Sequence, residues 1–228
     1  MFKNAILFLT ITIFAVFSFT ACSDDDPVTP DPTPKAKVMV VHASPDAPGV
    51  DLLVDNVVAG TNLTFPNNTG YLEVEAGVRN VKVNVTGTST TVIGADLNIV
   101  ANTAYSAFAV NTVANLEPVI FVDNLATPAS GKAHVRFIHL SPDAPAVDIT
   151  LTDGTVVFSN VAFKGSVDFT PLDAGTYPLQ VRVAGTTTVA LELGNITLQA
   201  GKIYTVFAKG LLSGTGTQAL GANIIANN

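Results

Sequence analysis

Tryptophan is absent from this sequence, and cysteine occurs only once among its 228 residues. A single cysteine excludes an intrachain disulfide and any zinc site built on paired cysteines. The chain holds three histidines, but it has no His-x-x-x-His pair, no Gly-x-Ser-x-Gly elbow and no Asp-x-Asp-x-Asp-Gly run. The sequence therefore predicts a protein that is not an enzyme and that uses no metal and no cofactor.

Charge is also sparse, because only 13% of the residues are charged. Acidic residues outnumber basic ones by 18 to 11, which gives a net charge of −7 at pH 7. An acidic surface repels phosphate groups, so nucleic acid is not expected among the partners. The lack of tryptophan also makes it less favoured that the protein binds carbohydrate by stacking sugars on aromatic side chains.

The one long apolar run lies at the start of the chain, between Lys3 and Cys22. A basic residue followed by about 17 mostly apolar residues and a small residue, here Ala21, is typical of a secretory signal peptide. The run is at the lower limit for a membrane-spanning helix, and acidic rather than basic residues follow it. We therefore expect residues 1–21 to be a cleaved signal peptide, with an uncleaved anchor as the alternative.

Cys22 directly follows Ala21 at the end of this run, an arrangement that resembles the lipobox of bacterial lipoproteins. In such lipoproteins the cysteine is diacylated and becomes the first residue of the mature chain. Phe19 stands where leucine is usual. The resemblance implies that Cys22 is the lipidation site and that a lipid anchor holds the protein at a membrane, because two acyl chains bind a bilayer stably.

Residues 22–35 predict an acidic, proline-rich stalk. Four prolines in PVTPDPTPK favour extended polyproline II structure without a core. The Ser-Asp-Asp-Asp after Cys22 resembles the export signal of lipoproteins in Bacteroidetes-type bacteria. This resemblance implies an outer-membrane location with the protein facing the cell surface, and a periplasmic orientation is the alternative.

The main part of the chain contains one unit twice. HASPDAPGVD starts at His42 and HLSPDAPAVD starts at His139, so the two segments are 97 residues apart and identical at eight of ten positions. Other segments match later in each unit, such as AYSAFA and IYTVFA. A repeat of this length sets the size of the folding unit. We expect domains at 36–127 and 131–228, joined as two beads with restricted hinge motion.

Apolar residues alternate with polar ones along each unit, and no stretch carries a sustained helical period. Val81, Val83 and Val85 show this alternation, which is typical of antiparallel strands buried on one face. Such runs give about seven strands per unit when Ile93–Val100 and Tyr105–Asn111 are taken as one. We predict an all-β protein with two tandem immunoglobulin-like or transthyretin-like antiparallel β-sandwiches, whose strand order stays open.

Several features together resemble the DUF4397 domain of bacterial envelope proteins: the strand before His-x-Ser-Pro-Asp-Ala-Pro, the x-Val-Asp after it, the Ala-Gly pair and the late Tyr-x-x-Phe-Ala. The resemblance covers residues 37–228 in two copies. It implies extracytoplasmic β-domains, often in tandem, and it brings no established chemistry. With the lipobox, the chain is similar to a tandem DUF4397 lipoprotein.

The decapeptides supply most of the candidate site residues. Each histidine ends an apolar stripe on one strand face, so its ring is expected to close the core and bond to the following turn. The aspartate after the first proline is expected to cap exposed turn amides. We interpret these positions as a structural motif, with a ligand-binding or general-base histidine as the alternative: His42, Ser44, Pro45, Asp46, His139, Ser141, Pro142 and Asp143.

Four aspartates are the candidates for ligand binding, namely Asp46, Asp51, Asp143 and Asp148. Asp51 and Asp148 are expected on the solvent face of the strand that follows each decapeptide. Calcium prefers six to eight oxygen ligands, and the spacing of these carboxylates does not supply them. No metal site is therefore predicted.

These observations favour a non-enzymatic cell-envelope lipoprotein that serves as an interaction or adhesion module at the cell surface. The sequence does not name its protein or glycan partner. A solute- or glycan-binding accessory lipoprotein is the alternative, and an unrecognised hydrolase is the third hypothesis. A cleft rich in exposed aromatic residues would favour the accessory protein, and clustered carboxylates with raised pKa values would favour the hydrolase.

Overall fold

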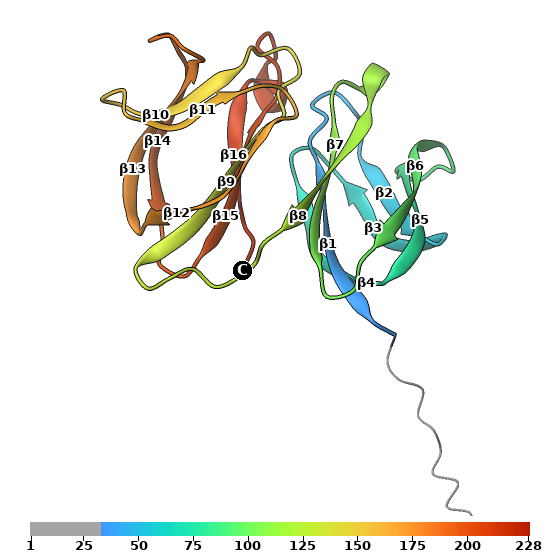
Figure 1. Cartoon of the computed structure of the whole chain (residues 1–228). Helices are drawn as coiled ribbons and strands as arrows, with labels where there is room; N and C mark the ends of the chain where they lie inside the picture. Colours follow the sequence, from blue (N-terminus) through green and yellow to red (C-terminus); the bar gives the residue numbers. More distant parts are fainter. Residues whose placement is uncertain (1–32) are drawn as a thin grey trace, which may run out of the picture. The chain divides into compact units, whose positions relative to one another are not determined.

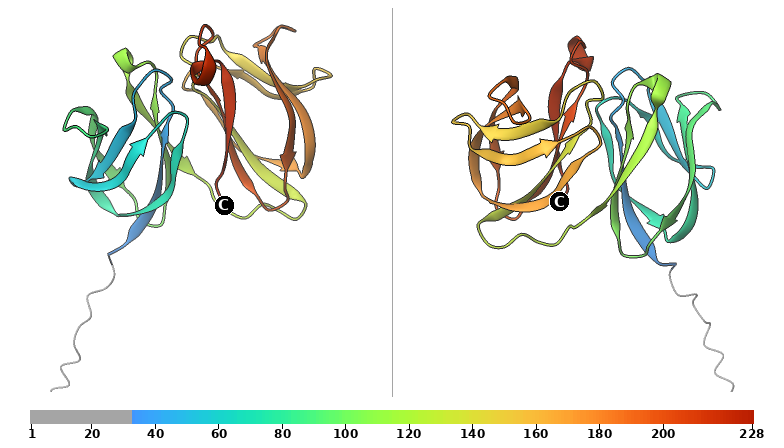
Figure 2. Two further views of the ribbon diagram at one scale, coloured as in Figure 1. Left: turned by 180° about the vertical axis from the view of Figure 1, so that it is seen from behind. Right: turned by 45° about the horizontal axis from the view of Figure 1, so that its top comes forward.

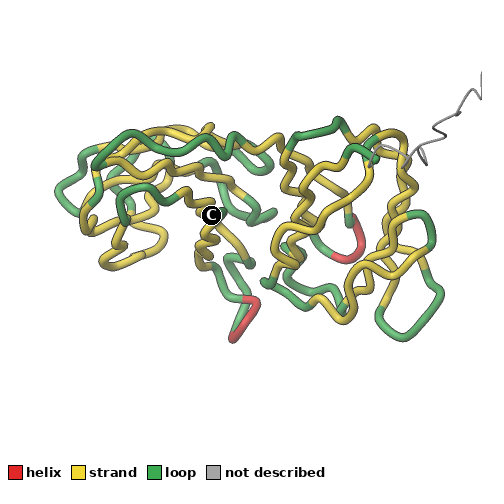
Figure 3. The backbone as a smooth tube through the Cα atoms, turned by 90° about the horizontal axis from the view of Figure 1, so that it is seen from below, coloured by secondary structure: helices red, strands yellow, loops and turns green. Residues whose placement is uncertain are grey.

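The structure, a computed structural model, describes residues 33–228. The signal peptide predicted for residues 1–21, the lipidation site Cys22 and most of the stalk predicted for residues 22–35 lie outside the described residues. Strands dominate, with two short 3₁₀ turns at Val113–Asn115 and Gly216–Gln218 (Figure 3). No helix in this part of the chain is long and apolar enough to span a membrane.

Each repeat folds into eight strands (Figure 1). The first repeat contains β1 (Lys35–His42), β2 (Val50–Val54), β3 (Val57–Leu63), β4 (Asn68–Glu75), β5 (Gly77–Val85), β6 (Thr91–Ile99), β7 (Ala104–Val110) and β8 (Glu117–Asp123). The second repeat contains β9 (Lys132–His139), β10 (Val147–Leu151), β11 (Val156–Val161), β12 (Ser166–Asp173), β13 (Gly175–Val183), β14 (Val189–Leu198), β15 (Ile203–Lys209) and β16 (Gly221–Ala226).

The strands of each repeat form two four-stranded sheets that pack as a sandwich (Figure 2). The sheet orders are β4-β1-β7-β8 and β3-β2-β5-β6 in the first repeat, and β12-β9-β15-β16 and β11-β10-β13-β14 in the second. β1 pairs in parallel with β7, and β9 with β15, whereas the other strand pairs are antiparallel. The prediction of an all-β protein with two tandem sandwiches is confirmed.

The expected count of seven strands per repeat is wrong, because the apolar stretch from Ile93 to Asn111 forms two strands. Asn102 adopts a left-handed conformation with φ of 58°, in the turn that separates β6 from β7. β6 pairs with β5 in one sheet, and β7 pairs with β1 and β8 in the other. Alternation with period two continues on both sides of the turn, so the pattern alone does not separate the two strands.

Each sandwich has its own core between its two sheets. The first core is formed by Val40, Val50, Leu52, Leu63 and Val83. The second core is larger, and it draws on both sheets of the second repeat: Ala133, Val135, Phe137, Val147, Ile149, Phe158, Val161, Val181, Leu198, Val206 and Ala208. Burial of such apolar surface is the main stabilising contribution in a sandwich of this size.

A third buried cluster joins the two repeats. Met39, Val41 and Phe108 lie on the faces of β1 and β7 turned away from their own core, and they pack in one cluster with Ile138 and Phe207 of the second repeat. Successive residues of a strand point to opposite faces, so β1 and β9 are largely buried on both faces. The described chain forms one compact unit. In addition to its own core, each sandwich therefore contributes residues to an apolar cluster that joins the two repeats.

Candidate functional site

The histidines of the two decapeptides end their strands in the same way. His42 is 1% exposed and His139 is fully buried. Nε2 of His42 lies 2.9 Å from the carbonyl oxygen of Pro48, and Nε2 of His139 lies 2.9 Å from that of Pro145. A carbonyl can only accept, so Nε2 carries the proton and donates it. Each imidazole therefore holds the decapeptide turn against the end of its own strand.

Burial lowers the pKa of both imidazoles, because desolvation disfavours the charged ring, and the hydrogen bond to the proline carbonyl opposes this only in part. In the second repeat the unprotonated Nδ1 of His139 also accepts from the backbone N–H of Ser141 at 3.3 Å. Both rings are thus buried, neutral side chains that face the protein backbone rather than a solvent-filled cleft.

The serines and prolines of the motif lie inside the same turns. Ser141 Oγ donates to the carbonyl oxygen of Gly210 at 2.8 Å, which ties the turn to the end of β15. Ser44 is also fully buried, but its hydroxyl has no hydrogen-bond partner within residues 33–228. Pro45 is buried and Pro142 is half-buried.

Asp46 and Asp143 connect each decapeptide to a distant loop. Asp46 Oδ1 accepts from the backbone N–H of Val113 at 2.8 Å. Both oxygens of Asp143 accept from the backbone N–H of Leu212, at 3.0 and 3.1 Å. The carboxylates therefore cap amides, but these amides belong to the loop after β7 or β15 and not to the decapeptide turn itself.

Asp51 and Asp148 each bridge two backbone segments. Asp51 accepts from the N–H groups of Asn62 at 2.8 Å and Gly87 at 3.1 Å, and these hydrogen bonds hold its pKa below the usual value. Asp148 makes the matching contacts in the second repeat, at 2.7 and 2.9 Å. The four candidate aspartates thus lie in separate places, and no group of three histidine, cysteine or acidic side chains in residues 33–228 could hold a metal.

The structure also contains a buried polar cluster that the sequence pattern did not reveal. Nη1 of Arg136 lies 2.6 Å from Oδ1 of Asp123, and Nη2 donates to Ser106 at 3.2 Å and to Thr205 at 2.9 Å. The Tyr71 hydroxyl donates to the other oxygen of Asp123 at 2.6 Å. Three of these residues belong to the first repeat and two to the second, so the cluster bridges the repeats.

Every charge in this cluster is satisfied by the protein. Burial, and then the hydrogen bond to Asp123, raise the pKa of Tyr71 to about 12, so its hydroxyl stays protonated and donates. The Arg136 guanidinium also lies over two rings, 5.5 Å from the centroid of Phe121 and 4.5 Å from that of Phe169. A paired, fully hydrogen-bonded and buried charge is typical of a structural ion pair.

The sequence contains one signal for this cluster. Arg136 stands in the apolar strand HVRFIHL, at the position where the first repeat has Met39. Alternation places both residues on the face opposite Val135 and Phe137, and a one-sided sandwich pattern assigns that face to solvent. The other repeat covers it instead, which is why an arginine is buried there.

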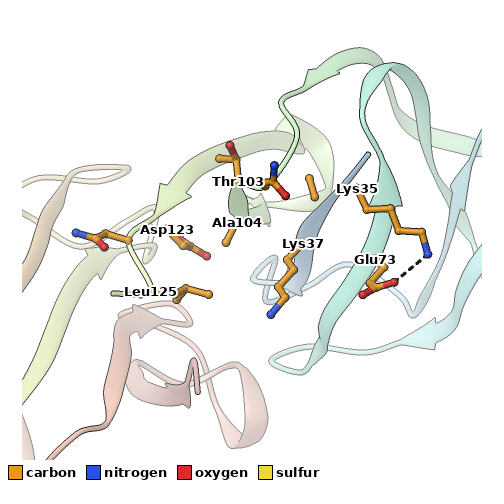
Figure 4. A pocket seen from close by; sticks show the side chains of 10 residues that line it. Lys35, Lys37, Glu73, Thr103, Ala104, Asp123 and Leu125 are labelled. Atoms are coloured by element: carbon orange, nitrogen blue, oxygen red, sulfur yellow. Dashed lines mark hydrogen bonds and ion pairs between the residues drawn. The ribbon is translucent and has the colours of Figure 1, made fainter. Parts of the chain in front are cut away.

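An open, polar pocket of about 580 Å³ lies at the start of β1 (Figure 4). Lys35, Lys37, Glu73 and Asp123 are among the residues that line it. Lys35 is paired with Glu73 at 2.9 Å, and Asp123 is engaged by Arg136. The pocket is open, and the carboxylates of Glu73 and Asp123 are already paired with basic side chains. It therefore suits a transient polar contact with a partner better than enclosed binding of a ligand.

The chain matches a family model with the description "Domain of unknown function (DUF4397)", over residues 36–150 and 150–227. No curated protein matches the chain. Among solved structures, the C-terminal domain of AlgF from P. aeruginosa is 21% identical, and the match covers 42% of this chain and 98% of that domain with a TM-score of 0.33. The Bacillus anthracis TIE protein is 14% identical over 77% of this chain and 33% of its own length, with a TM-score of 0.25. At these TM-scores neither likeness bears on function.

Proposed function

This chain belongs to the DUF4397 family, in two tandem copies, and from that premise we propose that it is a non-enzymatic lipoprotein of the cell envelope. Cys22 carries the lipid anchor, which holds the protein at the outer membrane with its sandwiches facing the cell surface. There it serves as an interaction or adhesion module for a protein or glycan partner, and it binds neither nucleic acid nor a cofactor.

One observation supports binding rather than catalysis: the polar side chains that the two decapeptides share are engaged with backbone groups. His42 and His139 donate to proline carbonyls, and the motif aspartates accept from loop amides. General acid–base catalysis needs a titratable group that reaches the substrate. The feature that both repeats contain is instead a β-sandwich whose loops are tied by these hydrogen bonds, which suits the display of a binding surface.

The alternative is a solute- or glycan-binding accessory lipoprotein. The open pocket beside Lys35 and Lys37 is the observation in its favour. Binding of small anions or soluble sugars that is lost in Lys37→Ala would support this alternative against the interaction module.

Cell fractionation of Cys22→Ser tests the anchor. The variant lacks the only thiol that can be acylated, so we expect it in the soluble fraction, whereas the unchanged protein stays with the outer membrane. Protease added to intact cells should degrade the unchanged protein. A variant that stayed in the membrane pellet with its first 21 residues attached would replace the lipid anchor by a peptide anchor.

Cross-linking on intact cells tests the interaction role. We expect the surface-exposed protein to be recovered with a defined envelope or extracellular partner, and the yield to fall when the protein is released by Cys22→Ser. Recovery of the protein with no partner, from cells on which protease shows it to be exposed, would contradict the interaction function.

A further inference from the structure

One facing pair of residues differs sharply in size between the two repeats. In the second repeat Phe158 of β11 lies opposite Ile149 of β10, is 7% exposed and stacks on Phe137 with ring centroids 6.5 Å apart. In the first repeat the residue opposite Leu52 of β2 is Gly60 of β3. The ring that fills the second sandwich therefore has no counterpart in the first.

The first sandwich is open at this place. Val40 stands where the second repeat has Phe137, so the first core lacks two aromatic rings. Two adjoining hollows follow the open edge between β3 and β4: one of about 240 Å³, lined in part by Leu52, Gly60 and Leu72, and one of about 380 Å³ that shares Leu72. We call them together the β3–β4 groove.

The backbone does not require glycine at position 60. Gly60 has no left-handed φ, and a Cβ atom there would lie 3.6 Å from Cγ2 of Thr69 and 3.8 Å from Cβ of Leu52, which is ordinary van der Waals contact. In the second repeat the apolar cavity that Phe158 lines is only about 30 Å³. A glycine inside a strand weakens it and often marks the close approach of a ligand or another backbone.

Both walls of the groove are edge strands. β3 and β4 each lie at the end of a sheet, so one side of each strand presents backbone N–H and C=O groups to which no other strand of residues 33–228 is paired. β3 also exposes two apolar side chains, Val57 at 69% and Val58 at 57%. An extended peptide is the ligand that matches such an edge, because it can add main-chain hydrogen bonds and place side chains in adjacent hollows.

The rim of the groove is acidic. Asp55, Glu73 and Glu75 line the larger hollow together with a single arginine, Arg79. Arg79 lies 3.1 Å from Asp55 and 3.5 Å from Glu75, so two carboxylates share one guanidinium, and Glu73 is paired with Lys35. The negative charge that is left beside Arg79 would be complemented by a lysine or arginine of the ligand.

We propose that the β3–β4 groove binds an extended segment of a partner protein. The segment inserts one aromatic side chain over Leu52 and Leu72, in the space beside Gly60, and it places basic residues next to Asp55 and Glu75. The inserted ring completes the first sandwich in the way that Phe158 completes the second. This proposal rests on the proposed interaction function and names its surface and the chemistry of its partner.

Titration calorimetry on the full-length protein in detergent micelles tests the chemistry. The probe is the capped pentapeptide Lys-Val-Phe-Val-Lys, compared with Lys-Val-Ala-Val-Lys and Glu-Val-Phe-Val-Glu. We expect the first peptide to bind and the other two to bind at least about tenfold more weakly, since one lacks the anchor ring and the other reverses the charge. Equal affinity for all three peptides, or no heat from the first at millimolar concentration, would overturn the proposal.

Two glycine substitutions test the location. Gly60→Phe fills the groove with the side chain that the second repeat has, so we expect at least about a tenfold loss of affinity for Lys-Val-Phe-Val-Lys. Gly94→Phe is the matched control, because Gly94 is exposed on β6 and also lacks a left-handed φ, and it should leave the affinity unchanged. Gly60→Leu serves if Gly60→Phe does not fold. Unchanged affinity in a folded Gly60 variant would place the peptide elsewhere.

The surface cross-linking experiment separates this proposal from the proposed function. If Gly60→Phe is cross-linked to the same partner with the same yield, the groove is not the docking surface and the interaction function stands. If the unchanged protein has no partner on cells but binds the aromatic peptide through Gly60, the interaction function fails and the groove remains a peptide site.

Discussion

Arg136 and Asp123 form an ion pair of 2.6 Å where the two repeats meet, with side chains that are 2% and 0% exposed. Met39 occupies the position of Arg136 in the first repeat. The ion pair therefore makes the two contacting faces unequal, because β9 carries a buried arginine where the matching strand β1 carries an apolar side chain. A buried ion pair is weak evidence for stability, but the loss of one partner leaves a charge without water or counter-ion.

Asp123→Ala should lower the free energy of unfolding by about 3–5 kcal/mol, because it leaves the Arg136 guanidinium buried and unpaired. Urea denaturation followed by far-UV circular dichroism measures this change. The whole described chain should unfold at a lower midpoint, because the pair lies between both sandwiches.

The double variant Arg136→Met/Asp123→Asn is the control for this prediction. It removes both charges together, so it should destabilise the protein less than Asp123→Ala does. A loss below about 1 kcal/mol for Asp123→Ala would be typical of an exposed pair and would contradict the buried junction.

Phe207→Ala tests the apolar cluster that the repeats share. The Phe207 ring is fully buried and meets the Phe108 ring edge-on, with centroids 5.8 Å apart. In the whole chain we expect a loss of about 3–5 kcal/mol. In residues 132–228 produced alone, Phe108 is gone while second-repeat members of the cluster such as Ile138 remain, so the same substitution should destabilise this fragment clearly less than it destabilises the whole chain.

Phe158→Ala is the matched control, because Phe158 belongs to the core of the second sandwich itself. It should destabilise the whole chain and the separate second repeat to a similar degree. If Phe207→Ala also affected both equally, its ring would belong to one repeat only. If residues 132–228 did not melt in one cooperative transition, the predicted domain boundary would be wrong.

The architecture follows from local patterns in the sequence. Alternation with period two indicates strands, and the decapeptide repeat indicates two copies of one unit, because both signals are contained in short segments. Strand pairing is not local, and neither is the assignment of β6 and β7 to different sheets. The chain turns at one left-handed residue, Asn102, but asparagine in a polar turn does not by itself show that the next strand enters another sheet.

The contacts of the site can also be divided into those made within a short segment and those made between distant parts of the chain. The ring of His42 reaches a carbonyl six residues further along the chain, so a local argument could place it. The carboxylate of Asp46 reaches an amide 67 residues away, and the burial of Arg136 depends on the other repeat. The groove beside Gly60 appears only when β3 and β4 are brought together, since a glycine in a strand pattern indicates no more than a close approach or a bulge.

Calcium should not stabilise this protein. The oxygens of Asp51 already accept from two backbone amides, and those of Asp143 accept from one, so too few oxygen ligands are left for this ion. We expect the same melting temperature in millimolar calcium and in chelator. A rise in melting temperature with calcium that disappears in Asp51→Asn would show that the aspartates form a metal site after all.

The histidines should make the protein less stable in mild acid. Burial holds the pKa of His42 and His139 below the unfolded value of about 6.5. The unfolded chain therefore binds protons that the folded chain does not. The stability contributed by the neutral rings is present in full above about pH 6.5 and is lost as the pH falls toward the folded-state pKa. Thermal melts at about pH 7.5 and about pH 5.5 should show a lower midpoint at the acidic value.

Two variants separate the fold-supporting role of His139 from a functional one. His139→Gln keeps a donor for the Pro145 carbonyl but does not titrate, so it should reduce the difference between the two melts. His139→Ala should lower the free energy of unfolding by about 1–3 kcal/mol, because the Pro145 carbonyl loses its donor and the packing of a buried ring is lost. Both variants should still bind the partner at temperatures where they are folded. A ligand or catalytic base on an open surface would behave in the opposite way, so an unchanged melting temperature with binding abolished would show that the imidazole acts on the partner rather than on the fold.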